Sequence, residues 1–228
     1  MKTRIVLAGL LALCVGRSAS AVVIRLDVDS TYNNVAGTTN PIVTQPGFTS
    51  YDAGSGAGGV TAERSIDVDG VTITFFGGID GSRQRNDDVG GGGGGEYDAL
   101  LRDFVFNDGS GAAVALRLAN LPLGTYDVSS WHYDALAGTP GMTQVEVRNQ
   151  GVPNTVILAD AVPFSPDPIR YQITVDEEGE VLELVFRDDD PVNNRSRLNG
   201  IVIETVPEPT AAGILLVGMA ALSLRRRH

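Results

Sequence analysis

The sequence predicts an all-β protein whose body, residues 22–205, is one antiparallel β-sandwich of two sheets. Short segments throughout this body alternate apolar and polar side chains with a period of two, as half-buried strands do. Turn signals such as Asp69-Gly70 separate the segments at the spacing expected for hairpins. No long helical pattern occurs outside the two apolar chain ends. Roughly ten short strands are therefore expected, with a long helix only at each end.

The first half of the body opens with a strand over residues 22–29, where Ile24, Leu26 and Val28 share a face. A polar loop follows, and the aromatic residues Phe48 and Tyr51 beyond it are expected to cover the sandwich as a lid. Residues 65–76 are expected to form a hairpin. The six glycines 90–95 have acidic flanks and lack the sequence context of a phosphate-binding loop, so they indicate a surface loop.

The second half is more regular. Residues 97–102 predict one short helical turn, since Tyr97, Leu100 and Leu101 would share a face. The alternation and the turn residues then predict strands over 104–106, 114–119, 126–133, 145–147, 156–158, 171–175, 181–186 and 198–204.

The N-terminus has the pattern of a signal peptide, residues 1–21. Lys2 and Arg4 precede an apolar stretch, and Ala19 and Ala21 form a small-residue cleavage site. Acylation of Cys14, as in a lipoprotein, is the alternative, but the residue before it is a bulky leucine. Cleavage after Ala21 would leave a chain with no cysteine, which excludes disulfides and thiolate sites.

The C-terminus, residues 206–228, has three parts. Val206-Pro207-Glu208-Pro209 comes first, then 15 uncharged residues, and finally Arg225, Arg226 and Arg227. As a helix the uncharged run is about 22 Å long, against roughly 30 Å of bilayer hydrocarbon, and the arginines mark a cytoplasmic end. An ordinary C-terminal membrane anchor is one interpretation of these three parts.

The tail also resembles the PEP-CTERM sorting signal of Gram-negative bacteria, and this is the interpretation that the Pro-Glu-Pro triplet favours. The resemblance implies that an exosortase-type membrane protease recognises the tail and removes it after a transient stay in the inner membrane. The body would then reach the cell envelope or the extracellular matrix.

The charge of the expected mature chain, Val22 to Pro209, excludes one class of partner. Its 188 residues keep 11 basic and all 28 acidic residues, so the net charge is −17. Such a chain repels nucleic acid and attracts cations.

A second resemblance concerns the body. Four segments follow each other at spacings that resemble galactose-binding-like or malectin-like jelly rolls: Leu101-Arg102-Asp103-Phe104, Leu121-Pro122-Leu123-Gly124-Thr125-Tyr126, Trp131-His132-Tyr133-Asp134 and Leu198-Asn199-Gly200-Ile201-Val202-Ile203-Glu204. The resemblance implies a jelly-roll-like sandwich and hints at a carbohydrate ligand.

Trp131, His132, Tyr133 and Asp134 are the candidate ligand-binding residues, because sugar sites combine aromatic planes with carboxylates. In a regular strand Trp131 and Tyr133 would lie on one face, with His132 and Asp134 on the other. The alternative makes Trp131 a core aromatic and gives His132 a neighbouring carboxylate as partner.

Aspartates gather in two places that suit a structural Ca²⁺ ion. These are Asp27 with Asp29, and Asp188 with Asp189 and Asp190. Neither place has the spacing of an EF-hand, and the second is better explained as a solvated turn beside Arg187 and Arg195.

The body is not expected to be an enzyme, because it holds one histidine and no nucleophile-elbow motif. The sequence favours an exported surface or matrix protein associated with glycan or exopolysaccharide. A structural matrix component without a small-ligand site, or a secreted carbohydrate-active enzyme, are the alternatives.

Overall fold

The computed structural model describes residues 21–33, 38–39, 41–53, 63–76, 79–85, 96–108, 113–134, 142–149, 156–163, 166–188 and 195–207. Val22–Thr205 is one compact unit; Met1–Ala21 with Val206–His228 is another. Ala19, Glu208, Pro209, Arg225, Arg226 and Arg227 lie outside the described residues, as does most of both predicted export segments. Within the described residues, no helix has the length and apolar character needed to cross a membrane.

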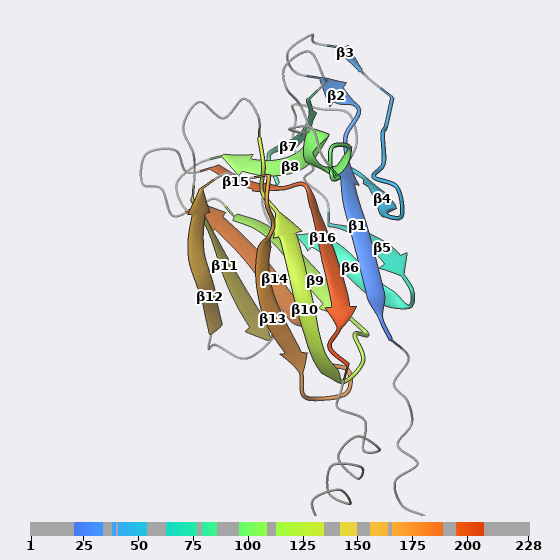
Figure 1. The fold of residues 1–228 in the computed structure, drawn as a ribbon, viewed down its shortest axis with the longest axis vertical. Coiled ribbons are helices and arrows are strands. Elements are labelled where there is room, and N and C mark those ends of the chain that lie inside the picture. Colours follow the sequence, from blue (N-terminus) through green and yellow to red (C-terminus); the bar gives the residue numbers. More distant parts are fainter. Residues whose placement is uncertain are drawn as a thin grey trace, which may run out of the picture. The chain divides into compact units, whose positions relative to one another are not determined.

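The body confirms the all-β prediction: two large sheets enclose a common core (Figure 1). The first sheet has the order β13-β10-β16-β1-β4 and the second β12-β11-β14-β9-β6-β5. The strands of the first are β13 Ile169–Val175, β10 Gly124–Trp131, β16 Gly200–Thr205, β1 Val23–Asp29 and β4 Thr49–Asp52. Those of the second are β12 Val156–Pro163, β11 Met142–Asn149, β14 Leu182–Asp188, β9 Ala113–Ala119, β6 Val71–Phe76 and β5 Arg64–Val68.

The structure departs from the antiparallel two-sheet prediction in two ways. β4 pairs with β1 in parallel, and two smaller sheets stand beside the sandwich, β15-β8-β7 and β2-β3. Their strands are β15 Arg195–Leu198, β8 Asp103–Asp108, β7 Gly81–Gln84, β2 Tyr32–Asn33 and β3 Thr38–Thr39. β7 has no apolar side chain, so hydrophobic alternation could not reveal it.

The core follows from the alternation along the strands. Ile24, Leu26 and Val28 of β1 point inward, as expected, and belong to one core cluster with Leu116 and Phe186 of the second sheet. Tyr51 also points inward, stacking on Phe75 with ring centroids 4.0 Å apart. The expectation that Tyr51 forms a lid with Phe48 is therefore wrong for Tyr51, because β4 continues the sheet and turns that side chain into the core.

The predicted hairpin is present between β5 and β6. Asp69 and Gly70 both have positive φ, 53° and 82°, which is the requirement of a two-residue turn that matches strand twist. The short helical turn predicted near residue 100 is the 3₁₀ helix η2, Leu100–Arg102.

Candidate functional site

The end of β10 separates the four candidate ligand-binding residues as strand geometry requires. Trp131 and Tyr133 belong to a small cluster with Leu100, Leu101, Phe48, Tyr97 and Val202. His132 points the opposite way and its ring lies 4.8 Å from that of Phe186. The four side chains therefore do not line one surface.

His132 and Asp134 form hydrogen bonds and ion pairs inside the protein. His132 Nδ1 donates to the carbonyl of Arg197 (2.6 Å), and Nε2 accepts from the Ser130 hydroxyl (2.9 Å). Its partners are thus a carbonyl and a hydroxyl rather than a carboxylate. Burial lowers the pKa of His132 to about 4, so the ring is neutral at pH 7. Asp134 pairs with Arg85 at 3.0 Å and with Arg197 at 3.2 Å, and all three side chains are buried.

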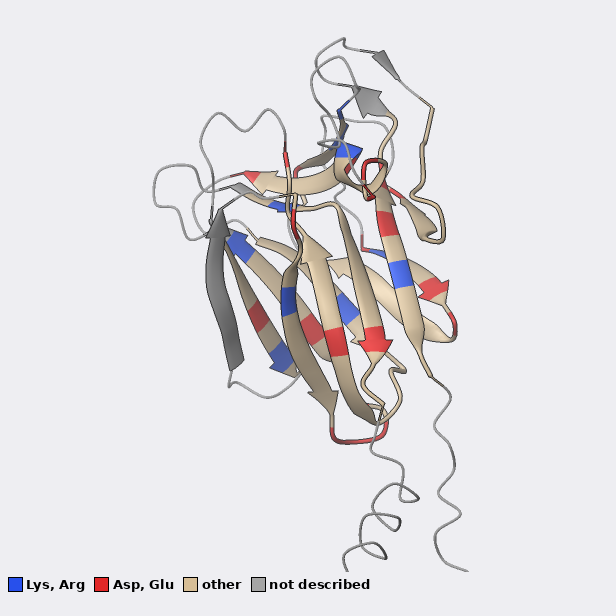
Figure 2. Ribbon diagram, in the orientation of Figure 1, with Lys and Arg blue, Asp and Glu red and all other residues tan. Residues whose placement is uncertain are grey.

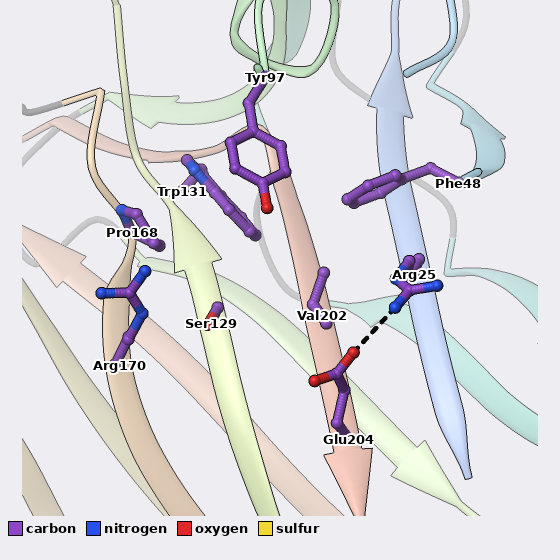
Figure 3. A pocket seen from close by; sticks show the side chains of 9 residues that line it. All are labelled: Arg25, Phe48, Tyr97, Ser129, Trp131, Pro168, Arg170, Val202 and Glu204. Carbon is purple, nitrogen blue, oxygen red and sulfur yellow. Dashed lines mark hydrogen bonds and ion pairs between the residues drawn. The ribbon is translucent and has the colours of Figure 1, made fainter. Parts of the chain in front are cut away.

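A shallow groove lies on the outer face of the first sheet. It encloses about 150 Å³ and is lined by Arg25, Phe48, Tyr97, Ser129, Trp131, Pro168, Arg170, Val202 and Glu204 (Figure 3). These residues come from four neighbouring strands and from the segments just before β4, β13 and η2. The groove exists only because the chain brings these segments together.

Three aromatic rings, Phe48, Tyr97 and Trp131, form the upper wall of the groove; we call them the aromatic wall. The Tyr97 and Trp131 centroids are 4.9 Å apart, and Phe48 meets the other two edge-on at 6.4 and 6.5 Å. Trp131 is only 2% exposed, while Phe48 and Tyr97 are partly exposed. Trp131 is therefore the base of the wall, and Tyr97 and Phe48 offer the accessible ring surface.

Gln45 ties the two loops that carry the wall. Its Nε2 donates to the carbonyl of Glu96 (2.8 Å), and its Oε1 accepts from the backbone N–H of Leu100 (3.3 Å). Its own carbonyl accepts from the N–H of Phe48 at 3.0 Å. One buried side chain thus sets the distance between Phe48 and Tyr97.

The floor of the groove is one row of side chains across four strands. The registers pair Arg170 with Ser129, Ser129 with Val202, and Val202 with Arg25. Two residues further along each strand, the next row of side chains on the same face is Gln172, Asp127, Glu204 and Val23. In these two rows the basic residues are Arg25 of β1 and Arg170 of β13, and the acidic ones are Asp127 of β10 and Glu204 of β16. Charged positions of both signs therefore lie on this sheet (Figure 2).

Gly200 lets η2 approach the sheet above this floor. A Cβ there would collide with Leu100 Cδ1 and lie 2.6 Å from the carbonyl oxygen of Leu26. Glycine at this position is required by the close contact rather than by a turn.

Three carboxyl groups are buried near Gln45, those of Asp27, Asp29 and Asp103. Each residue is 0% exposed. Burial, followed by the charge of Asp29, raises the pKa of Asp27 to about 8. Burial and the charges of Asp29 and Asp27 raise the pKa of Asp103 to about 9. At neutral pH the ion-free cluster therefore holds protons.

The cluster partly fits a cation. Asp27 accepts from the N–H of Gln45 (2.6 Å), and Asp29 accepts from Thr44 (2.8 Å) and Ser50. One oxygen each of Asp27 and Asp29 has no hydrogen-bond partner in the described part of the chain. The Asp103 carboxyl faces the Ser30 backbone N–H and the Gln84 side chain, which lower its pKa but do not offset burial.

Hard oxygen donors of this kind suit Ca²⁺. Yet among the described residues, no three His, Cys, Asp or Glu side chains are gathered closely enough to hold a metal. Of the other predicted metal ligands, Asp189 and Asp190 lie outside the described residues, and for Asp188 only its place at the end of β14 is described.

Sequence reasoning missed most of the groove. Arg25, Arg170 and Glu204 were visible only as polar positions of alternating strands, and Tyr97 as part of a helical turn. The signal that joins them is the register between strands 179 residues apart, such as Arg25 with Glu204. No local pattern carries that information.

Comparisons with known proteins gave structural matches alone. No protein-family model matches the sequence, and no curated protein does. The chain is similar to a calcium-binding mutant of Bacteroides uniformis β-glucuronidase 2, with a TM-score of 0.47 and 12% identity over 82% of this chain and 18% of that chain. It spans less than a fifth of that enzyme.

Two carbohydrate-binding modules are also similar. A family 29 module matches with a TM-score of 0.33 and 14% identity, over 82% of this chain and 90% of that chain. TmCBM61, solved in complex with β-1,4-galactotriose, matches with a TM-score of 0.33 and 13% identity, over 64% and 90%. Because these TM-scores are below 0.5, the function of this chain has to be inferred from the groove itself.

Proposed function

We propose that the body is a glycan-binding module and that the groove on the first sheet is its binding site. The observation that carries the proposal is an aromatic wall standing directly over a polar floor. A pyranose presents an apolar face that packs on an aromatic ring and hydroxyls that need hydrogen-bond partners. Tyr97 and Phe48 supply the ring surface, and Ser129, Arg170 and the Arg25–Glu204 pair supply donors and acceptors.

A glycan array followed by titration tests this proposal on the full-length chain. Trp131 is the single tryptophan and forms the base of the wall, so its fluorescence should report binding. Tyr97→Ala should abolish binding to any glycan that the wild type retains. Phe76→Ala is the matched control, because Phe76 is a partly buried aromatic on the second sheet, where it lies under Arg117. Absence of binding to every glycan on the array would overturn the proposal.

We propose further that this module is exported and does not catalyse a reaction. The support is the signal-peptide pattern at one end and the PEP-CTERM resemblance at the other. Intact mass of the protein recovered from its host tests the route. A mass matching Val22 to about Pro209 is expected, whereas retention of 210–228 would indicate a plain membrane anchor.

A structural Ca²⁺ ion at Asp27, Asp29 and Asp103 is part of the same proposal. The support is the set of buried oxygens without partners, and the carboxyls would have to move closer together to share an ion. Thermal unfolding with Ca²⁺ and then with a chelator is the test. A higher melting temperature with Ca²⁺ is expected, lost in Asp103→Asn; an unchanged one refutes it.

A further inference from the structure

The charges on the floor of the groove are not equivalent. At one end of the row, Arg25 is paired with Glu204 at 2.9 Å, and both side chains are nearly half exposed. At the other end, Arg170 has no hydrogen-bond or ion-pair partner among the residues that the structure describes. The carboxylate on the next row, Asp127, accepts a hydrogen bond from Gln172 (2.8 Å). One guanidinium group is thus left for a ligand.

The position of Arg170 favours a ligand over solvent alone. It lies directly across from Ser129 and lines the groove together with Pro168 and Trp131 (Figure 3). A sugar ring seated on Tyr97 would therefore have its far side over the row that carries Arg170. The planar guanidinium group binds a carboxylate with two parallel hydrogen bonds, which a hydroxyl cannot accept in the same way.

The charge of the groove is opposite to that of the chain. Its charged lining is Arg25, Arg170 and Glu204, with a net charge of +1, whereas the whole chain has a net charge of −11. A polyanion is repelled by such a chain in general. It would be attracted only where a basic group is exposed without a partner, as Arg170 of the groove is within the described part of the chain.

We propose that the groove selects an acidic polysaccharide, with an anionic group of the sugar held by Arg170 and the sugar ring packed against Tyr97. This inference rests on the proposed glycan-binding function and gives it a substrate class. The shared chemistry is an anionic group on a sugar, either the carboxylate of a uronic acid or a sulfate ester. The carboxylate is the better match to the flat guanidinium group.

The test compares three polysaccharides on the full-length chain: polygalacturonate, dextran sulfate and uncharged galactan. A chelator is present throughout, so that divalent ions cannot bridge the acidic protein to an acidic glycan. Tryptophan fluorescence and affinity electrophoresis report binding. We expect polygalacturonate to bind most tightly, with an affinity that falls as salt rises.

Variants of Arg170 test whether this side chain binds the anionic group of the sugar. Arg170→Gln should weaken binding of polygalacturonate by about 10- to 100-fold, since a charge-assisted hydrogen bond is lost. Arg170→Lys should recover part of the loss, because the charge remains and the bidentate geometry does not. Arg64→Gln is the matched control, an exposed arginine of β5 on the second sheet, and should change nothing.

Three results separate the possible failures. Galactan binding as tightly as polygalacturonate, with Arg170→Gln without effect, would overturn the inference and leave glycan binding intact. Tighter binding of dextran sulfate would overturn the carboxylate assignment in favour of a sulfate ester. Failure to bind any of the three, or any glycan on the array, would overturn the proposed function as well.

Discussion

Because the pKa values of three buried carboxyl groups are raised, we expect the free energy of unfolding to fall as pH rises through neutrality when no cation is bound. Asp27 and Asp103 have pKa values of about 8 and about 9 in the folded chain, against 3.8 when exposed. Between pH 6.5 and 7.5 the folded chain therefore holds protons that the unfolded chain has released. Stability falls with pH wherever the folded state binds more protons.

The size of the effect follows from that difference. Each carboxyl contributes about 1.4 kcal/mol for each pH unit over which it is protonated when folded and ionised when unfolded. His132 has the opposite effect. Because its pKa is lower in the folded chain than in the unfolded chain, the free energy of unfolding decreases as pH falls through 6.5. In this window its contribution is small, so the net loss is about 2 kcal/mol. That corresponds to a melting temperature lower by about 4–8 °C.

Thermal unfolding of the full-length chain, followed by circular dichroism with a chelator at several pH values, measures the slope. Asp103→Asn removes one titrating group and mimics its protonated form, so it should reduce the slope by about half and stabilise the chain at pH 7.5. Asp176→Asn is the matched control, because Asp176 is an exposed carboxylate just after β13. A melting temperature that stays constant or rises from pH 6.5 to 7.5 would refute the reasoning.

Three further predictions concern the parts that build the groove, each measured by urea unfolding. Asp134→Asn should lower the free energy of unfolding by about 3–5 kcal/mol, because the buried Arg85 and Arg197 lose their carboxylate partner. Glu204→Gln removes the carboxylate of an exposed ion pair and should cost no more than about 1 kcal/mol. Equal losses in the two variants would contradict this prediction. Gly200→Ala should lower the free energy of unfolding by about 1–3 kcal/mol and shift the fluorescence emission of Trp131, because the added methyl group displaces Leu100 from the sheet. An unchanged free energy of unfolding would show that η2 can move freely. Trp131→Ala should cost about 3–5 kcal/mol through the cavity it leaves, and a loss below about 1 kcal/mol would mean that Phe48 and Tyr97 collapse into the space.

Much of the fold could be predicted from local patterns. The alternation in β1, β9 and β10 indicated which side chains enter the core, and Asp69-Gly70 indicated the hairpin turn that joins β5 to β6. The same alternation separated Trp131 from His132. These features are predictable because the two faces of a strand differ in solvent exposure, which the sequence records residue by residue.

The parallel pairing of β4 and the strand β7 could not be predicted in this way. β4 has four residues and β7 has no apolar side chain, so neither produces a periodic signal. Their positions depend on partners that are distant in the sequence, as in the pairing of Gln84 with Asp103.

By itself, then, the sequence determined an all-β body, the inward faces of its main strands and its acidic charge; the export signals at its ends stay predictions. The tertiary structure decided what the outer face can bind. It placed Arg170, Ser129, Val202 and Arg25 in one row and set Tyr97 above them. It also buried Asp27 and Asp29 beside Asp103, where the strand pattern alone would have left them in solvent. The physical reason is that burial and pairing depend on register between distant strands, whereas alternation depends only on neighbours along the chain.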